Sequence, residues 1–195
     1  MTIQTEKFMQ KAIAQAKNGS GRTAPNPPVG AVLVRDGKVV GEGFHPAAGQ
    51  PHAEVFALRD AGALARGAEL YVTLEPCCHQ GRTGPCTEAV IAAGVTRVFV
   101  GVQDPNPQVA GKGIKLLRAA GIDVVCDLLK TECQALIAPF RKHMLSGLPY
   151  FVLQSARTLA GQTATGNGYS TWISCEASRE HVHHLRPQVD GIMFV

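Results

Sequence analysis

A histidine and two cysteines have the residue types of a catalytic metal site. Zinc binds imidazole nitrogen and thiolate sulfur, and a catalytic site uses three protein ligands and keeps its fourth position for water. His52, Cys77 and Cys86 supply such a set. Glu54 follows His52 by two residues, and on the first turn of a helix its side chain would point near the metal; the alternative is a solvated surface residue. We predict a zinc site in which Glu54 moves the protons.

Two neighbouring residues are alternative ligands. Cys78 and His79 directly follow Cys77, and a structural zinc site would use one of them as a fourth ligand. Two adjacent cysteines would strain the backbone if both bound one ion. Cys86 lies across the loop GRTGP, which can bring it back, and it is expected to start a helix, whose N-terminus favours a thiolate. We therefore assign Cys86 to the metal and leave Cys78 and His79 to packing or to a substrate loop.

The segments around these residues alternate between helical and strand patterns. A helical period opens the chain, and Asp36-Gly37 between two apolar runs is typical of a two-residue hairpin. Alternating elements predict an α/β domain of three layers, with a mixed sheet and helices on both faces. The other expected elements are a helix from Pro51, strands over 68–74, 97–102 and 122–129, helices over 87–93 and 114–121, and a helix from a capping box at Thr131 and Gln134 to Leu145.

A second segment begins near Leu148. We expect a first domain over residues 1–147 and the incomplete start of another α/β domain over 148–195. In the second segment, 149–156 and 190–195 have strand patterns and 176–186 has a helical one. Because an uncovered apolar strand is prone to aggregate, we expect further protein beyond Val195 or a fragment.

Composition narrows the class of protein. The chain has 195 residues, of which 45% are hydrophobic and 17% charged, as in a globular protein. We expect it in the cytoplasm and away from membranes, since no run reaches the roughly 18 apolar residues of a membrane span and the N-terminus lacks a secretory signal. The net charge of +4 is too mild to indicate nucleic acid, and it suits a small anionic substrate.

Longer segments resemble one enzyme family. PNPPVGAVLV, GEGFHPAAGQPHAE, YVTLEPCCHQGRTGPC and DPNP followed by GKG closely resemble the deaminase half of the bifunctional deaminase/reductase of riboflavin biosynthesis. General zinc nucleobase deaminases have two residues between their cysteines, whereas this chain has eight between Cys77 and Cys86. The extended spacing separates this family from ordinary cytidine deaminases.

The resemblance implies a cytidine-deaminase-like fold and a reaction. 2,5-Diamino-6-ribosylamino-4(3H)-pyrimidinone 5′-phosphate would be hydrolysed to 5-amino-6-(5-phosphoribosylamino)uracil and ammonia. Zn²⁺ would be held by His52, Cys77 and Cys86, with Glu54 as acid and base. The resemblance also suggests a homo-oligomer.

Substrate contacts follow from the same resemblance. A cation, a hydroxyl and free loop amides suit the 5′-phosphate. Turn chemistry is the alternative for Asn and Asp beside Pro, and a solvated side chain is the alternative for the arginine. The implied contacts are Asn26 and His45 for ring and ribose, Arg82 and Thr83 for the phosphate, and Asp104 and Asn106 along the pocket.

The second segment resembles the start of the family's reductase domain, which is similar to dihydrofolate reductase and uses NADPH. STWIS and HHLR match that domain. The match implies Ser170 and Arg186 as substrate contacts and Ala156 and Trp172 near NADPH. Where the family usually has SLDGK or SLDGR, this chain has TLAGQ, with Ala160 in place of the Asp and Gln162 in place of the cation. The rest of that domain is also absent from the sequence given, so we expect no reduction by the chain as given.

Two other functions stay open. One is a different zinc deaminase, acting on cytidine, guanine or a tRNA base. A tRNA enzyme would be expected to carry a basic patch for the phosphate backbone, and the sequence has no evident one. The other is a zinc-binding module without catalysis.

Overall fold

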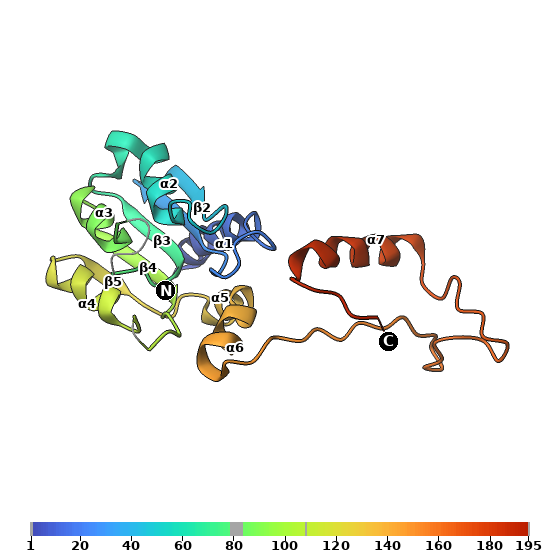
Figure 1. Ribbon diagram of the computed structural model, residues 1–195. Coiled ribbons are helices and arrows are strands. Elements are labelled where there is room, and N and C mark those ends of the chain that lie inside the picture. Colours follow the sequence, from blue (N-terminus) through green and yellow to red (C-terminus); the bar gives the residue numbers. More distant parts are fainter. Residues whose placement is uncertain (1, 79–83, 108, 195) are drawn as a thin grey trace. The chain divides into compact units, whose positions relative to one another are not determined.

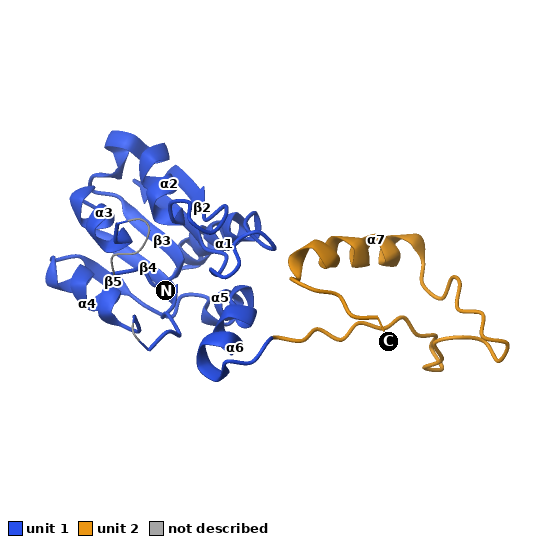
Figure 2. Cartoon of the chain, viewed as in Figure 1, with its two compact units in different colours: residues 1–149 blue, residues 150–195 orange. Residues whose placement is uncertain are grey.

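The computed structural model describes residues 2–78, 84–107 and 109–194. The chain divides into two compact units, residues 1–149 and 150–195 (Figure 2). The first unit carries the sheet and most of the helices (Figure 1). Across the described ranges, no helix is long and apolar enough to span a bilayer.

A mixed sheet forms the middle layer of the first unit, with strand order β2-β1-β3-β4-β5 (Figure 1). β1 pairs antiparallel with both β2 and β3, whereas β3, β4 and β5 are parallel. The predicted mixed sheet is therefore confirmed. The strands are β1 (Gly30–Arg35), β2 (Lys38–Phe44), β3 (Glu69–Leu74), β4 (Arg97–Val102) and β5 (Asp123–Val125).

Helices cover both faces of this sheet, as predicted. One face packs on α1 (Ile3–Lys17) and α5 (Lys130–Leu136). The other packs on α2 (Ala53–Ala61), α3 (Cys86–Ala92) and α4 (Lys112–Ala119), with a short 3-10 turn, η1 (Gly62–Ala65), after α2.

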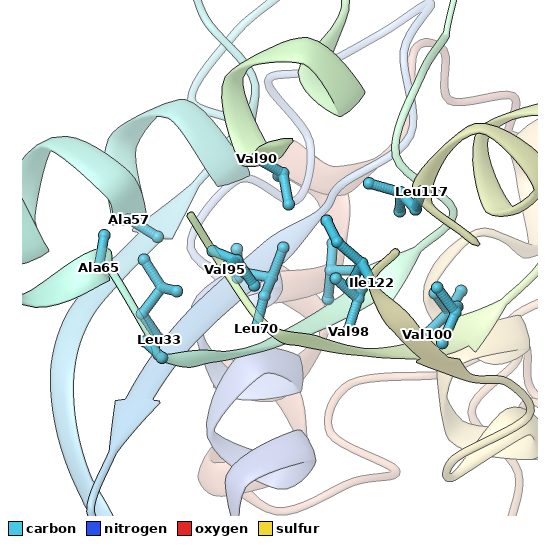
Figure 3. Packing of buried hydrophobic residues seen from close by; sticks show 14 of the residues in the cluster. Leu33, Ala57, Ala65, Leu70, Val90, Val95, Val98, Val100, Leu117 and Ile122 are labelled. Atoms are coloured by element: carbon cyan, nitrogen blue, oxygen red, sulfur yellow. The ribbon is translucent and has the colours of Figure 1, made fainter. Parts of the chain in front are cut away.

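Side chains of the central strands alternate between these two cores. Leu33, Leu70 and Val98 point toward Ala57 and Leu117 of the helices (Figure 3). The residues that adjoin them in the chain, Val32, Tyr71 and Phe99, belong to the core on the α1 side. Because successive strand residues face opposite sides, β1, β3 and β4 are buried on both faces and read as continuous apolar runs.

The hairpin and α2 bring one half of the site into place. Asp36 and Gly37 have φ angles of 51° and 71° between β1 and β2, which confirms the predicted turn. On β2, a Cβ at Gly43 would lie 2.5 Å from the Ala53 carbonyl oxygen, so only glycine allows α2 to approach so closely. The start of α2 is thereby fixed against the sheet.

Two predictions for the end of the first unit are wrong. β5 has three residues instead of the expected 122–129. The expected helix from Thr131 to Leu145 is two helices, α5 and α6 (Ala138–Ser146). Pro139 lacks an N–H and cannot continue α5, so it lies in the first turn of a new helix. No capping box forms, since α5 begins at Lys130 with Leu129 as its N-cap residue.

The second unit contains α7 (Glu176–Leu185) and a 3-10 turn, η2 (Arg186–Gln188). The helix confirms the prediction over 176–186. The strands predicted over 149–156 and 190–195 are absent from the described residues there. A strand is stable only when neighbouring strands accept its hydrogen bonds, and in this unit none is described beside either segment.

Candidate metal centre

The structure brings the three predicted ligands together. The ligand atoms of His52, Cys77 and Cys86 all lie within 4.8 Å of one another. Nδ1 of His52 is 3.1 Å from the Cys86 sulfur and 3.4 Å from the Cys77 sulfur. Cys78 does not belong to this cluster of described residues.

Two helix starts and one strand end position the three side chains. His52 is the N-cap residue of α2, and Cys86 is the first residue of α3. Cys77 follows the end of β3, and its sulfur accepts a hydrogen bond from the Cys86 backbone N–H at 3.3 Å. The Thr87 N–H donates to the Cys77 carbonyl oxygen at 3.1 Å. The N-terminus of α3 therefore faces the Cys77 sulfur, which favours a thiolate.

The cluster fits zinc in both chemistry and size. Zn–S and Zn–N bonds of about 2.3 Å and 2.0–2.1 Å in a tetrahedron place nitrogen and sulfur about 3.6 Å apart. The two nitrogen–sulfur distances are close to that value. Among the residues described, one imidazole and two thiols make three ligands, which is the number that a catalytic zinc site uses while it keeps a fourth position for water.

Hydrogen bonding already favours a thiolate in the cluster. The pKa of Cys77 lies well below its usual value, because the Cys86 side chain and then His52 hydrogen-bond to its sulfur. The same contact with Cys77 raises the pKa of His52. A divalent cation would replace these protons and hold both sulfurs as thiolates.

Glu54 lies beside the cluster with an unpaired oxygen. It is buried in the first turn of α2, and its Oε2 atom has no hydrogen-bond partner among the residues described. Burial raises the pKa of this carboxyl to about 7. An unpaired buried oxygen costs about 1–3 kcal/mol, so it indicates a group that Glu54 contacts when the site is loaded.

A second histidine supports the first. The buried His45 ring lies edge-on to His52, with ring centroids 5.2 Å apart. Its Nδ1 is 3.1 Å from the Pro51 carbonyl oxygen, which can only accept, so Nδ1 carries the proton. Nε2 then accepts from the Asn26 amide at 3.1 Å. Burial lowers the pKa of His45, consistent with a neutral ring. Direct contact of His45 and Asn26 with substrate stays a prediction.

The other predicted contacts are placed less specifically. The Asn106 N–H donates to the Asp104 side chain at 2.8 Å, so turn chemistry is present there, and a substrate role for either stays a prediction. Arg82 and Thr83 lie outside the described residues, as does His79. The four predicted contacts of the second unit are all exposed: Ala156, Ser170, Trp172 and Arg186. The Arg179 guanidinium lies over the Trp172 ring.

Sequence reasoning missed Glu75. This residue is buried directly after β3, where its carboxylate accepts hydrogen bonds from backbone amides far along the chain. The available signal was an acidic residue between a buried strand and the Pro-Cys pair of the metal centre.

Comparisons with known proteins agree with this geometry. Residues 2–102 match the family described as cytidine and deoxycytidylate deaminase zinc-binding region, and residues 149–194 match the RibD C-terminal domain. Riboflavin biosynthesis protein RibD of Escherichia coli is 51% identical over 98% of this chain. The chain spans about half of that relative, 52% of its length.

Solved structures show the same likeness. Acinetobacter baumannii RibD is 51% identical with a TM-score of 0.86, over 95% of this chain and 52% of that one. The diaminohydroxyphosphoribosylaminopyrimidine deaminase/5-amino-6-(5-phosphoribosylamino)uracil reductase of Thermotoga maritima is 45% identical with a TM-score of 0.87, over 94% and 53%. The predicted fold class is confirmed, including the start of a RibD C-terminal domain. The chain therefore belongs to the cytidine and deoxycytidylate deaminase zinc-binding family, and it is similar to RibD proteins over about half of their length.

Proposed function

We propose that this chain catalyses the hydrolytic deamination of 2,5-diamino-6-ribosylamino-4(3H)-pyrimidinone 5′-phosphate to 5-amino-6-(5-phosphoribosylamino)uracil. The observation that carries the proposal is the unpaired Oε2 atom of Glu54, in a carboxyl group that lies beside the His52, Cys77 and Cys86 cluster. The name of the Thermotoga maritima relative supports the substrate, because it describes a deaminase of this class of pyrimidine.

Metal binding and proton transfer would be carried out by different residues of the chain. His52, Cys77 and Cys86 would hold the metal. When bound, zinc would supply a Lewis acid that lowers the pKa of a coordinated water from about 15.7 to about 7. Glu54 would take the first proton of the water on its carboxylate and pass it to the ring nitrogen. It would then carry the proton of the hydroxyl group added to the ring carbon to the amino group, which leaves as ammonia. Positioned acid–base catalysis of this kind accelerates reactions by about 10²–10⁴-fold.

His45 would help to orient the His52 ligand. His45 packs its ring edge against His52 and is itself held by Pro51 and Asn26. Such outer contacts fix the orientation of a ligating imidazole. In the proposal, Asn26, His45, Asp104 and Asn106 line the pocket, and Arg82 and Thr83 take the 5′-phosphate.

The wider assignment is also part of the proposal. We place the deaminase domain over 1–147 and the start of a reductase domain over 148–195. Substrate contacts by Ser170 and Arg186, and NADPH contacts by Ala156 and Trp172, would belong to a complete reductase domain. The partner is a small phosphorylated pyrimidine, not nucleic acid or membrane, and the protein is a cytoplasmic homo-oligomer.

Ammonia release tests the proposal. Zinc-loaded protein is offered the pyrimidinone phosphate and, as a comparison, cytidine. We expect ammonia from the first and none above background from the second. Ammonia from cytidine alone would assign the chain to another deaminase, and ammonia from neither substrate would contradict the proposed reaction.

A further inference from the structure

The carboxylate of Glu75 is surrounded by backbone N–H groups. Oε2 accepts from Asp104 at 3.2 Å and from Gly111 at 2.9 Å. Oε1 accepts from Gly113 at 2.9 Å and from Ile114 at 3.2 Å. Two bonds on each oxygen make this one of the most fully hydrogen-bonded side chains described in the first unit. A buried charge is stable only with such partners.

These bonds close the connection between β4 and α4 at both ends. The first amides of a helix have no partner within the helix, and Gly111, the N-cap residue of α4, has no side chain to cap them. Glu75 supplies the missing acceptor for Gly113 and Ile114. Its other oxygen holds Asp104, near the beginning of the same connection. One carboxylate therefore fixes both the start of α4 and the segment that follows β4.

The same residue is joined to the metal centre through the backbone. The Glu75 N–H donates to the Val102 carbonyl oxygen at 2.9 Å, which continues the pairing of β3 with β4. Pro76 and Cys77 follow directly. A Cβ at Gly113 would lie 2.1 Å from the Pro76 carbonyl oxygen, so α4 begins in contact with the backbone that leads to Cys77.

We propose that Glu75 is a positioning residue for deamination. It holds the connection that carries Asp104 and Asn106 in place beside the segment that carries Cys77. It acts through that backbone and touches neither metal nor substrate. The inference rests on the proposed deaminase function, and it assigns the recognition of the substrate in part to a residue outside the pocket.

Glu75→Gln tests this role without changing side-chain volume. Glutamine has one acceptor oxygen, so its NH₂ group faces two N–H donors whichever way the amide points. The connection is loosened while the metal ligands remain. We expect zinc content to stay at the wild-type level, KM to rise about tenfold, and kcat to change less than about threefold, as when binding contacts are lost. Faster hydrogen exchange at residues 104 and 111 should accompany the change.

Glu69→Gln is the matched control. Glu69 lies at the opposite end of β3, where it accepts from the Tyr71 hydroxyl at 3.0 Å and pairs with the partly exposed Arg97. The same chemical change there should leave KM at the wild-type value. Gly113→Ala disturbs the same contact from the side of α4, because the new methyl group would displace the start of α4 from Pro76. It should also raise KM, and it carries the test if Glu75→Gln does not fold.

The outcomes are distinct. A lower kcat with unchanged KM would mean a merely structural residue and would overturn the inference. Loss of zinc would mean that Glu75 acts on Cys77 and not on the connection, which also contradicts it. If the wild-type protein releases no ammonia, the proposed function fails. Hydrogen exchange in Glu75→Gln then still decides the inference, because wild-type protection at residues 104 and 111 would overturn it.

Discussion

Among the described residues, the buried hydrophobic residues all lie in the first unit, whereas most large apolar residues of the second unit are exposed. Figure 2 colours the two units. Leu70 and Val98, on the sheet of the first unit, are 0% exposed, since helices cover both faces. Phe151 and Leu153 of the second unit are 81% and 92% exposed, although their segment is equally apolar. An apolar run therefore becomes a strand only where a neighbouring strand pairs with it and a helix covers it.

The two units also differ in the functional groups that they contain. The metal cluster and Glu54 lie in the first unit, between helix starts that the sheet positions. The second unit holds a helix and exposed polar side chains in its described residues. If stability and catalysis both belong to the first unit, substitutions there should have large effects, and substitutions in the second unit should have small ones.

The largest effect is expected from Glu54→Gln. Glutamine keeps the size of the side chain but cannot take up the proton, so kcat should fall about 10²–10⁴-fold while zinc stays bound. Kinetics of ammonia release and metal analysis on the same sample measure both. Glu180→Gln, on the exposed face of α7 in the second unit, is the control and should leave kcat unchanged. Wild-type turnover by Glu54→Gln would remove its assigned role.

A pair of leucines compares the two units in stability. Leu70→Ala should lower the free energy of unfolding by about 2–5 kcal/mol, because it leaves a cavity between the sheet and the helices. Leu153→Ala should change it by less than about 0.5 kcal/mol, as at exposed positions generally. Urea unfolding followed by circular dichroism gives both values. An equal loss of unfolding free energy in the two variants would show that Leu153 is buried in solution, which would contradict the difference between the units.

The smallest effect is expected from removing the second unit. A chain of residues 1–149 keeps the sheet, both cores and the metal cluster, and a unit with its own core can fold alone. Its zinc content should match that of the longer chain, and its kcat for deamination should stay within about twofold. Loss of zinc binding on truncation would mean that the second unit supports the metal centre.

Local residue patterns were sufficient for much of this arrangement. The hairpin at Asp36-Gly37 and the helix of Phe8 and Ala16 depend on neighbours in the sequence, and both were predicted correctly. The metal cluster could be predicted because histidine and cysteine are the residue types that bind zinc, as at His52 and Cys86. The break between α5 and α6 had a signal in the sequence, which is Pro139 itself. The prediction of one continuous helix followed the pattern of apolar residues instead.

Other features depend on contacts distant in the sequence. Glu75 binds amides 29 to 39 residues further along the chain, and nothing near it in the sequence specifies those partners. The strands expected in the second unit failed for a related reason, since pairing requires a partner strand. Substrate contacts cannot be derived from residue type either, because Asn106 serves a turn as readily as a ligand.

Removing and restoring zinc tests the central claim most directly. Ammonia release from the pyrimidinone phosphate is measured on the purified protein, again after chelation, and again after zinc is returned. The account predicts that activity disappears with the metal and returns as zinc reaches about one ion per chain, the number that one site of three protein ligands can hold. Ammonia release at the same rate from zinc-free protein would contradict it.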